Sequence, residues 1–231
     1  MKSCEFGQDP ARRIALFGGT FNPIHRGHLQ AAVDVLAQFR LDLIYFIPSA
    51  VPPHKSRGQL APAQERLEMV ALALAGHAQL MACDVEIQRQ GPSYSIDTVR
   101  RFKQTADPDC RLYFMIGLDA FMEIHTWRAF DLLFAETAFI VMSRPGSGQW
   151  SRQMRRQVAL YVQEHISSEY RLDAEEKALA HPSLRKVHLT SVTPVDAASS
   201  HIRDLIRQGR SIAPWVTPAV ADYIAQRGLY R

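Results

Sequence analysis

Two histidines three residues apart follow a glycine pair in the stretch IALFGGTFNPIHRGHLQAAVDVL, residues 14–36. Gly18 and Gly19 allow the backbone to turn and to approach a ligand closely, because glycine has no side chain. The helical pattern that follows would present unpaired N–H groups and the positive end of its dipole, which suits a phosphate. His25 and His28 can donate hydrogen bonds to phosphate oxygens and stabilise charge that develops there. The segment therefore predicts a phosphate-binding site.

Each of these features also has an ordinary structural interpretation. A glycine pair after a strand is often only a turn, and a single surface histidine usually has no function. A zinc site would need a third ligand, which the neighbouring sequence does not supply. Gly27 lies between the histidines and would keep the approach to a bulky anion clear. Taken together, the strand, the Gly-Gly-Thr turn, the two histidines and the helix favour phosphate binding.

Short apolar runs and helical patterns alternate along the chain, which predicts an α/β fold. The expected strands are residues 14–17, 43–47, 80–87, 112–116, 139–142 and 187–189. The expected helices are residues 29–39, 63–75, 95–104, 202–208 and 218–226. Such alternation favours a Rossmann-like, doubly wound parallel sheet with helices on both faces and a small C-terminal helical part. Ligands of these sheets bind at the carboxyl ends of the strands, so the first strand-to-helix turn is the expected site.

We expect one domain over residues 1–231, with an insertion at 145–185 and a C-terminal helical segment at 199–231. The insertion contains a helical pattern whose apolar face is formed by Met154, Val158, Val162 and Ile166. This face could pack on the sheet or against a partner subunit. Packing within the chain is favoured because connections usually cover the nearest surface. Whether the protein is a monomer or a homo-oligomer is left open.

Composition excludes several classes of protein. The 231 residues are 47% hydrophobic, enough to bury a sizeable core, and no stretch is apolar enough to predict a membrane span. A net charge of +4 fits an anionic partner without selecting one. Cys4, Cys83 and Cys110 are odd in number and widely scattered. They therefore predict ordinary thiols of a reducing compartment and a cytoplasmic location.

The segment GGTFNPIHRGH resembles the signature of the nucleotidyltransferase superfamily with the His-x-Gly-His motif. Its particular form is similar to that of the bacterial nicotinate-mononucleotide adenylyltransferases. Six further segments resemble blocks of that family in the same order: IPSAVPPHK (47–55), GPSYSIDT (91–98), FMIGLDAFMEIHTW (114–127), SRPG (143–146), SSHIR (199–203) and YIAQRGLY (223–230). The resemblance covers nearly the whole chain except the insertion. The Pro-Pro-His-Lys and Ser-Tyr blocks are more specific to this family than the histidine motif.

Three residues depart from the pattern of the family. Asn22 stands where aspartate is common, Ser95 where threonine is usual, and Ala198 where a Ser-Ser-Thr block normally begins with serine. Asparagine and serine keep their capacity for hydrogen bonds, whereas Ala198 removes one hydroxyl contact to phosphate.

The resemblance implies transfer of adenylate from ATP to nicotinate mononucleotide, which releases pyrophosphate and forms nicotinate adenine dinucleotide, a precursor of NAD. No covalent enzyme intermediate is implied, and Mg²⁺ is expected to arrive with ATP, without a dedicated protein site. The protein must align the acceptor phosphate with the α-phosphorus and neutralise charge on the leaving group. The implied catalytic residues are His25, His28, Lys55 and Arg203.

The resemblance also implies two sets of binding residues. Those for ATP are Gly18, Gly19, Thr20, Phe21, His25, His28, Gly117, Asp119, Arg144, Ser199, Ser200 and Arg203. Those for nicotinate mononucleotide are Lys55, Tyr94, Ser95, Asp119 and Trp127. In this interpretation Trp127 stacks on the nicotinate ring, backbone N–H groups near Tyr94 and Ser95 bind its carboxylate, and Arg144 stacks on adenine. Asp119 caps a helix, contacts a ribose hydroxyl, or does both.

Other functions remain to be distinguished. Taken alone, Lys55 could be solvated, SSHIR could be a helix cap with a surface arginine, and Trp127 could belong to the core. Phosphopantetheine adenylyltransferases and cytidylyltransferases share the first turn, but the former are shorter and have threonine in place of His25. A non-catalytic nucleotide sensor or an RNA-binding module would use the basic stretch at 152–156, but no aromatic residues for stacking bases accompany it. No nucleic-acid or membrane partner is therefore expected.

Overall fold

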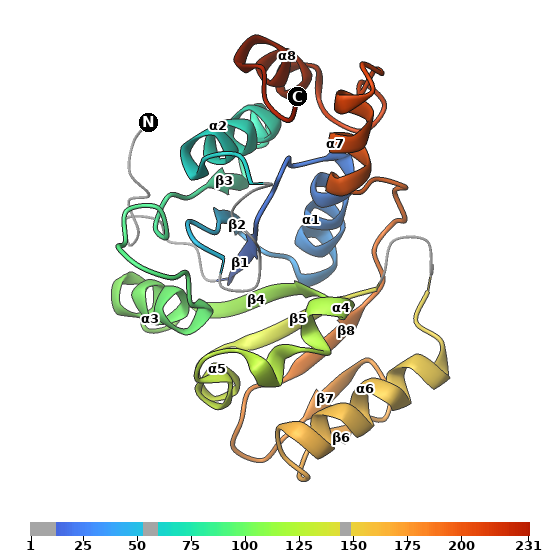
Figure 1. The fold of residues 1–231 in the computed structure, drawn as a ribbon. Helices are drawn as coiled ribbons and strands as arrows, with labels where there is room; N and C mark the ends of the chain where they lie inside the picture. Colours follow the sequence, from blue (N-terminus) through green and yellow to red (C-terminus); the bar gives the residue numbers. More distant parts are fainter. Residues whose placement is uncertain (1–12, 53–59, 144–148) are drawn as a thin grey trace.

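The fold is built on a mixed sheet with the strand order β3-β2-β1-β4-β5-β8-β7-β6 (Figure 1). The computed structural model describes residues 13–52, 60–143 and 149–231. Its strands are β1 Arg13–Gly19, β2 Leu43–Pro48, β3 Leu80–Ala82, β4 Arg111–Gly117, β5 Ala138–Met142, β6 Arg171–Leu172, β7 Ala178–Ala180 and β8 Val187–Thr190. Its helices are α1 Arg26–Phe39, α2 Ala63–Leu74, α3 Ser95–Thr105, α4 Leu118–Phe121, the 3₁₀-helix η2 Ile124–Thr126, α5 Phe130–Glu136, α6 Arg152–His165, α7 Ser199–Arg207 and α8 Pro218–Arg227.

Six neighbouring strands run parallel, in the spatial order β3, β2, β1, β4, β5 and β8. This arrangement confirms the predicted doubly wound parallel sheet. β1 lies between β2 and β4, with Ile14 opposite both Leu43 and Leu112. The chain moves outward from β1 to β3 and then returns to place β4 on the other side of β1. The strand order therefore reverses between β1 and β4, where ligands of such sheets bind.

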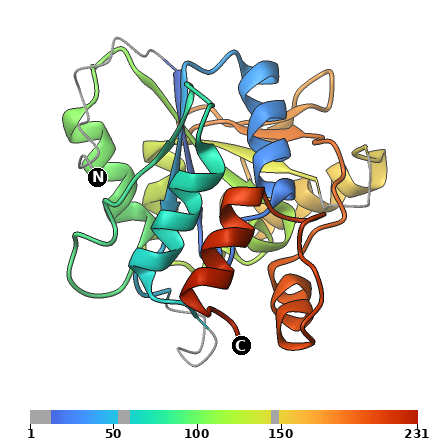
Figure 2. The ribbon, with the colours of Figure 1, turned by 90° about the horizontal axis from the view of Figure 1, so that it is seen from above.

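Both faces of the sheet are covered, as the alternating pattern predicts. One apolar cluster joins β1 residues such as Leu16 to α3, α5 and α6. The other cluster lies on the opposite face of the sheet and joins β1 residues such as Phe17 to α1, α2, α7 and α8. Seen from above, α2 and α8 lie side by side (Figure 2), and the Tyr223 hydroxyl of α8 donates a hydrogen bond to the Glu65 carboxylate of α2 at 2.7 Å. The predicted C-terminal helical part thus packs on the sheet through α2.

The observed secondary structure differs from the predicted one in the strand after α2 and in the helix before β5. The strand expected over residues 80–87 ends at Ala82, because residues 84–88 form a turn in which the Asp84 carbonyl accepts hydrogen bonds from the N–H groups of Ile87 and Gln88. The helix α5 was not predicted, because its seven residues make only two turns, too few to show a clear helical period before β5 begins. By contrast, Thr217, Pro218 and Gly228 mark the ends of α8 as expected, with Gly228 at φ +62°.

The segment 145–185 contributes to the sheet itself. It supplies α6 and then β6 and β7, which extend the edge beyond β8 in antiparallel orientation. These strands have two and three residues, too short to show an alternating pattern, and for this reason the sequence did not predict them. The predicted helix is present, and its face formed by Met154, Val158, Val162 and Ile166 packs on the apolar cluster of this chain. Packing within the chain is thus confirmed.

Alanine substitutions on the two faces of α6 should have different effects. Val162 is 0% exposed, whereas Leu160, on the opposite face, is 64% exposed. We expect Val162→Ala to lower the free energy of unfolding by about 1–3 kcal/mol, because it removes buried methyl groups and leaves a cavity. Leu160→Ala, its matched control, should change this free energy by less than about 0.5 kcal/mol. Urea denaturation measures both, and equal effects would contradict this packing.

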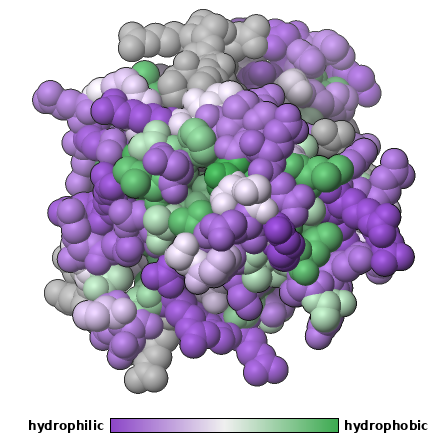
Figure 3. All heavy atoms as spheres, turned by 90° about the horizontal axis from the view of Figure 1, so that it is seen from below, coloured by the Kyte–Doolittle hydropathy of each residue, from purple (hydrophilic) through white to green (hydrophobic). Residues whose placement is uncertain are grey.

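The surface shows only scattered apolar areas on the side that carries α5 and α6. Viewed from below, hydrophobic atoms are interspersed with hydrophilic side chains (Figure 3). Leu132 of α5 and Leu160 of α6 are the large hydrophobic residues exposed on these two helices. Within residues 13–52, 60–143 and 149–231, no helix combines the length and the hydrophobicity that crossing a membrane requires. Cys83 and Cys110 are free thiols, and Cys4 lies outside the described residues.

Candidate active site

A cavity of about 530 Å³ opens at the carboxyl ends of β1, β2 and β4. The residues that line it include Gly18, Gly19 and Thr20 after β1, Ile47 and Ser49 at the end of β2, and residues 114–117 of β4. Its far wall is formed by Glu86, Tyr94, Ser95, Thr98, Trp127 and Arg128. The cavity therefore lies at the reversal of strand order, where the sequence predicted a ligand.

The turn between β1 and α1 differs from the prediction in one respect. Gly18 and Gly19 still belong to β1, and the left-handed residue of the turn is Phe21, with φ +45°. Gly19 is required for another reason, because a Cβ atom there would lie 3.0 Å from the ring of Phe21. Phe21 is 2% exposed and its ring packs against that of His28, with the ring centres 5.0 Å apart. A contact between Phe21 and ATP would thus come from its backbone.

His25 and His28 lie together at the start of α1, as predicted. Their ring centres are 3.7 Å apart, and the backbone N–H of His25 donates a hydrogen bond to His28 Nδ1 at 3.2 Å. His25 precedes the first helical residue, so both side chains stay at the helix end where N–H groups lack partners within the helix. A Cβ atom on Gly27 would lie 3.1 Å from His25 Nδ1. Gly27 therefore makes room for the His25 ring, more directly than for an incoming anion.

The protonation of the two histidines follows from these contacts. Burial lowers the pKa of His25 to about 4, so this imidazole is neutral at pH 7. Its Nδ1 atom is buried and has no hydrogen-bond partner among the described residues. Because His28 Nδ1 accepts a hydrogen bond, the neutral ring carries its hydrogen on Nε2. Nε2 is then the ring atom of His28 that can donate a hydrogen bond.

The residues expected to bind the ring of the substrate line the same cavity. Tyr94 precedes α3 and Ser95 is its first residue, so the first N–H groups of α3 lie at the cavity wall. Trp127 is partly buried and its indole meets the Phe114 ring edge to face, with the ring centres 6.1 Å apart. The guanidinium of Arg128 lies 4.7 Å from the centre of the Tyr94 ring. One planar ring and a set of backbone donors thus face one space.

Arg203 and Ser199 hold α7 against the histidine turn. Arg203 Nη1 donates a hydrogen bond to the Asn22 carbonyl at 2.8 Å, and the Ser199 hydroxyl donates one to the Pro23 carbonyl at 2.9 Å. Ser200 is exposed on the first turn of α7. Arg203 does not line the cavity that contains Trp127 but a neighbouring one of about 340 Å³. Its Nε atom is buried and unpaired within the part of the chain that the structure describes.

The remaining predicted residues divide into two groups. Gly117 lines the cavity, and Asp119 is exposed on the first turn of α4, next to the cavity residue Ala120. The residue that precedes α4 is Gly117, so Asp119 does not occupy the capping position but places a carboxylate in the first turn of the helix. Lys55 and Arg144 lie outside the described residues.

Two buried charged residues of the site were not predicted. Arg66 is 1% exposed and donates hydrogen bonds to the carbonyls of Thr20 at 2.7 Å, Ser49 at 2.6 Å and Ala61 at 3.0 Å. These bonds join the ends of β1 and β2 to the start of α2. Glu86 is buried in the cavity wall. An arginine on the apolar face of α2, with Met69, was the available signal, whereas Glu86 lies in an unremarkable turn.

Asn22, one of the three departures from the family pattern, is held in place by two hydrogen bonds. It is buried, and its amide oxygen accepts hydrogen bonds from the Ala61 N–H at 3.0 Å and from the Tyr230 hydroxyl at 2.9 Å. Burial raises the pKa of Tyr230, so its hydroxyl keeps the proton that it donates. Asn22 therefore joins the histidine turn to the start of α2 and to the C-terminal segment.

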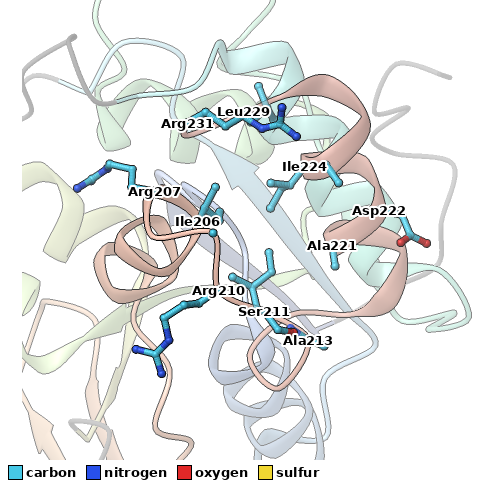
Figure 4. A pocket seen from close by; sticks show the side chains of 13 residues that line it. Ile206, Arg207, Arg210, Ser211, Ala213, Ala221, Asp222, Ile224, Leu229 and Arg231 are labelled. Atoms are coloured by element: carbon cyan, nitrogen blue, oxygen red, sulfur yellow. The ribbon is translucent and has the colours of Figure 1, made fainter.

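A larger cavity of about 750 Å³ lies between α7 and α8 and contains none of the predicted residues (Figure 4). Ile206, Ala221, Ile224 and Leu229 line it, while the side chains of Arg207 and Arg210 extend away from its middle. The cavity of about 530 Å³ is the better candidate, because the start of α3 supplies backbone donors to it and Trp127 supplies a planar ring. No cluster of three or more histidine, cysteine or acidic residues that could hold a metal ion occurs among the described residues.

Comparisons with known proteins give the relatives of this chain. The model of the cytidylyltransferase-like family matches residues 16–204. The chain is 39% identical over 221 residues to a protein of Desulfatibacillum aliphaticivorans named "probable nicotinate-nucleotide adenylyltransferase", covering 94% of this chain and 99% of that one. It is 38% identical over 218 residues to a protein of the same name from Geobacter metallireducens, covering 94% and 98%.

Solved structures extend the likeness to the fold. The Plasmodium falciparum nicotinic acid mononucleotide adenylyltransferase complexed with NaAD superposes with a TM-score of 0.70 at 19% identity. The alignment covers 95% of this chain and 97% of that chain. The same enzyme complexed with APC gives a TM-score of 0.68. These similarities show that the two chains share one fold.

Proposed function

Since this chain belongs to the nicotinate-nucleotide adenylyltransferases, within the cytidylyltransferase-like family, we propose that it transfers the adenylyl group of ATP to nicotinate mononucleotide in NAD biosynthesis. The products are nicotinate adenine dinucleotide and pyrophosphate. The observation that carries this proposal is the composition of one cavity. It has the turn before the two histidines at one end, and Trp127 with the start of α3 at the other.

The transfer requires alignment more than covalent chemistry. An oxygen of the mononucleotide phosphate forms a bond to the α-phosphorus of ATP, while the bond from that phosphorus to the bridging oxygen of pyrophosphate breaks. The acceptor phosphate is already a nucleophile, so no side chain has to remove a proton from it. The protein contributes by holding the reactants in line and stabilising charge on the phosphate oxygens.

We assign this stabilisation to the histidine turn. His28 Nε2 donates to an oxygen of the ATP phosphates, and the neutral ring of His25 packs beside it and donates from the same helix end. Arg203, which lies against Asn22, binds the outer phosphates with its remaining donors. The resemblance to the family further implies that Lys55 supplies a cation and that Arg144 stacks on adenine, although both lie outside the described residues. Mg²⁺ would come with the triphosphate of ATP and would neutralise part of its charge, without a dedicated set of protein ligands.

We expect the site to prefer the acid over the amide form of the mononucleotide. If the N–H groups at the start of α3 point at the ring substituent, a carboxylate accepts all of them, whereas an amide turns its NH₂ group toward at least one. A buried N–H without a partner costs about 1–3 kcal/mol, so kcat/KM should favour nicotinate mononucleotide by at least about tenfold. Trp127 stacks on both rings, and Trp127→Ala should weaken both substrates together.

A panel of acceptors tested with ATP and Mg²⁺ examines this function. Nicotinate mononucleotide, nicotinamide mononucleotide and phosphopantetheine are compared as acceptors, and CTP is tested as an alternative donor. We expect pyrophosphate release with ATP to be most efficient with nicotinate mononucleotide, weaker with nicotinamide mononucleotide, and absent with phosphopantetheine or with CTP as the donor. Comparable efficiency with the two mononucleotides would refute the carboxylate argument and leave adenylyl transfer standing. Binding of ATP without turnover of any acceptor would favour a nucleotide sensor.

A further inference from the structure

A buried carboxyl group faces the end of the cavity assigned to the substrate ring. Glu86 is 6% exposed and lines the cavity together with Tyr94, Ser95 and Trp127. Its Oε1 atom accepts a hydrogen bond from the Thr98 hydroxyl on the first turns of α3 at 2.8 Å. Its Oε2 atom is buried and, among the described residues, has no hydrogen-bond partner. A buried polar atom without a partner at a cavity wall marks a place where a ligand completes the contacts.

The arginines near Glu86 make their contacts with other groups. Arg89, three residues along the same loop, donates to the Tyr94 carbonyl at 3.4 Å. Arg66 of α2 donates to three backbone carbonyls. Arg128, after η2, lies over the Tyr94 ring. The nearby hydroxyls of Thr98 on α3 and of Ser93 in the loop before it favour the charged form of Glu86, and the more distant Arg89 and Arg66 favour it through their positive charge. Burial outweighs them and raises the pKa of Glu86.

A second negative charge enters this cavity when the proposed substrate binds. This step rests on the proposed function, which places the ring carboxylate at the start of α3. Two carboxylates that lie close together in one cavity repel each other, so that one of them takes up a proton. We propose that Glu86 binds a proton together with the acid-form mononucleotide, so that a neutral carboxyl group faces the anionic ring and sets the preference for acid over amide.

The amide form makes the opposite demand on the same group. Ionised Glu86 is an acceptor only and can receive a hydrogen bond from the NH₂ group of nicotinamide. Protonated Glu86 can donate its O–H to the nicotinate carboxylate. The charge of Glu86 thus favours one ring substituent or the other. The preference for the acid should therefore fall as the pH rises through the titration of Glu86.

The test is the ratio of kcat/KM for nicotinate mononucleotide to that for nicotinamide mononucleotide between pH 6 and pH 9. Titration of ATP, of the histidines and of the common phosphate affects both substrates and cancels in the ratio. For the unchanged protein we expect the ratio to fall by up to about tenfold per pH unit once Glu86 ionises. In Glu86→Gln, which is neutral and keeps an NH₂ donor, the ratio should stay constant and in favour of the acid. The control is Glu123→Gln, an exposed residue before η2, and it should follow the unchanged protein.

Calorimetry gives a second measurement that needs no variant. Binding of each mononucleotide is measured in two buffers of different ionisation enthalpy, over the same range of pH. We expect proton uptake with the acid form, above the uptake seen with the amide form, at the pH where the kinetic ratio falls. A ratio that does not change with pH, or equal proton uptake for the two ligands at every pH, would overturn the role of Glu86. If neither mononucleotide is adenylylated at any pH, the proposed function fails instead, and differential proton uptake still decides the protonation of Glu86.

Discussion

Replacing His28 by alanine is expected to lower kcat by about a hundredfold or more, because it removes a donor held in place before the reaction begins. The hydrogen bond from the His25 N–H to Nδ1 and the contact with the Phe21 ring fix the imidazole with Nε2 as its donor. A donor fixed in this way contributes to the transition state without reorganising. The free energy of unfolding should change by no more than about 1 kcal/mol, since the lost bond is that of a single helix-end N–H.

Turnover with ATP and nicotinate mononucleotide, together with urea denaturation, measures both effects. His25→Ala should also lose most of its turnover, with a larger cost in stability because the His25 ring is buried. The matched control is His77→Ala, an exposed histidine beyond the end of α2, which should leave both quantities unchanged. Near-normal turnover in a well-folded His28→Ala protein would remove the catalytic role assigned to this residue.

The sequence predicted the part of the site that follows from local patterns. The apolar run of β1 and the helical period of α1 are both strong, and they place His25 and His28 at the junction between a buried strand and a helix end. The position of the cavity follows from the alternation of strands and helices alone. Ser95 could be placed at the start of a helix for the same reason.

Features that depend on tertiary packing could not be predicted in this way. The left-handed conformation belongs to Phe21 and not to the glycines before it, since the core formed with Phe17 and Phe46 holds the Phe21 ring in place. The short strand β7 forms on the edge that β8 offers, and β6 in turn pairs with β7. The burial of Glu86 results from its contact with α3. Thr98 of that helix lies only twelve residues along the chain, but no pattern in the sequence shows that the two side chains meet.

Arg66 illustrates how one buried side chain can join several parts of a site. Its guanidinium has five donors in a rigid plane, and it reaches carbonyls at the end of β1, at the end of β2 and before α2. Burial lowers the pKa of Arg66, yet arginine stays protonated in proteins. The positive charge is therefore retained and is balanced by carbonyl dipoles of the segments that form the cavity.

We expect Arg66→Met to lower the free energy of unfolding by about 3–5 kcal/mol, because the carbonyls of Thr20, Ser49 and Ala61, which are buried or partly buried, lose a charged donor at once. Methionine fills much of the space of the arginine stem, so the loss measures the hydrogen bonds more than the packing. The stability of Arg66→Lys should lie between that of Arg66→Met and that of the unchanged protein, since one ammonium group cannot reach three carbonyls that diverge around a planar fork.

Urea denaturation measures these differences, with Arg101→Met on the exposed side of α3 as the control that should change stability by less than about 0.5 kcal/mol. Equal stability of Arg66→Met and Arg101→Met would show that water replaces the guanidinium without cost. The three segments would then have to be held together by the sheet alone, and the carbonyl contacts of Arg66 would be a consequence of their arrangement, not its cause.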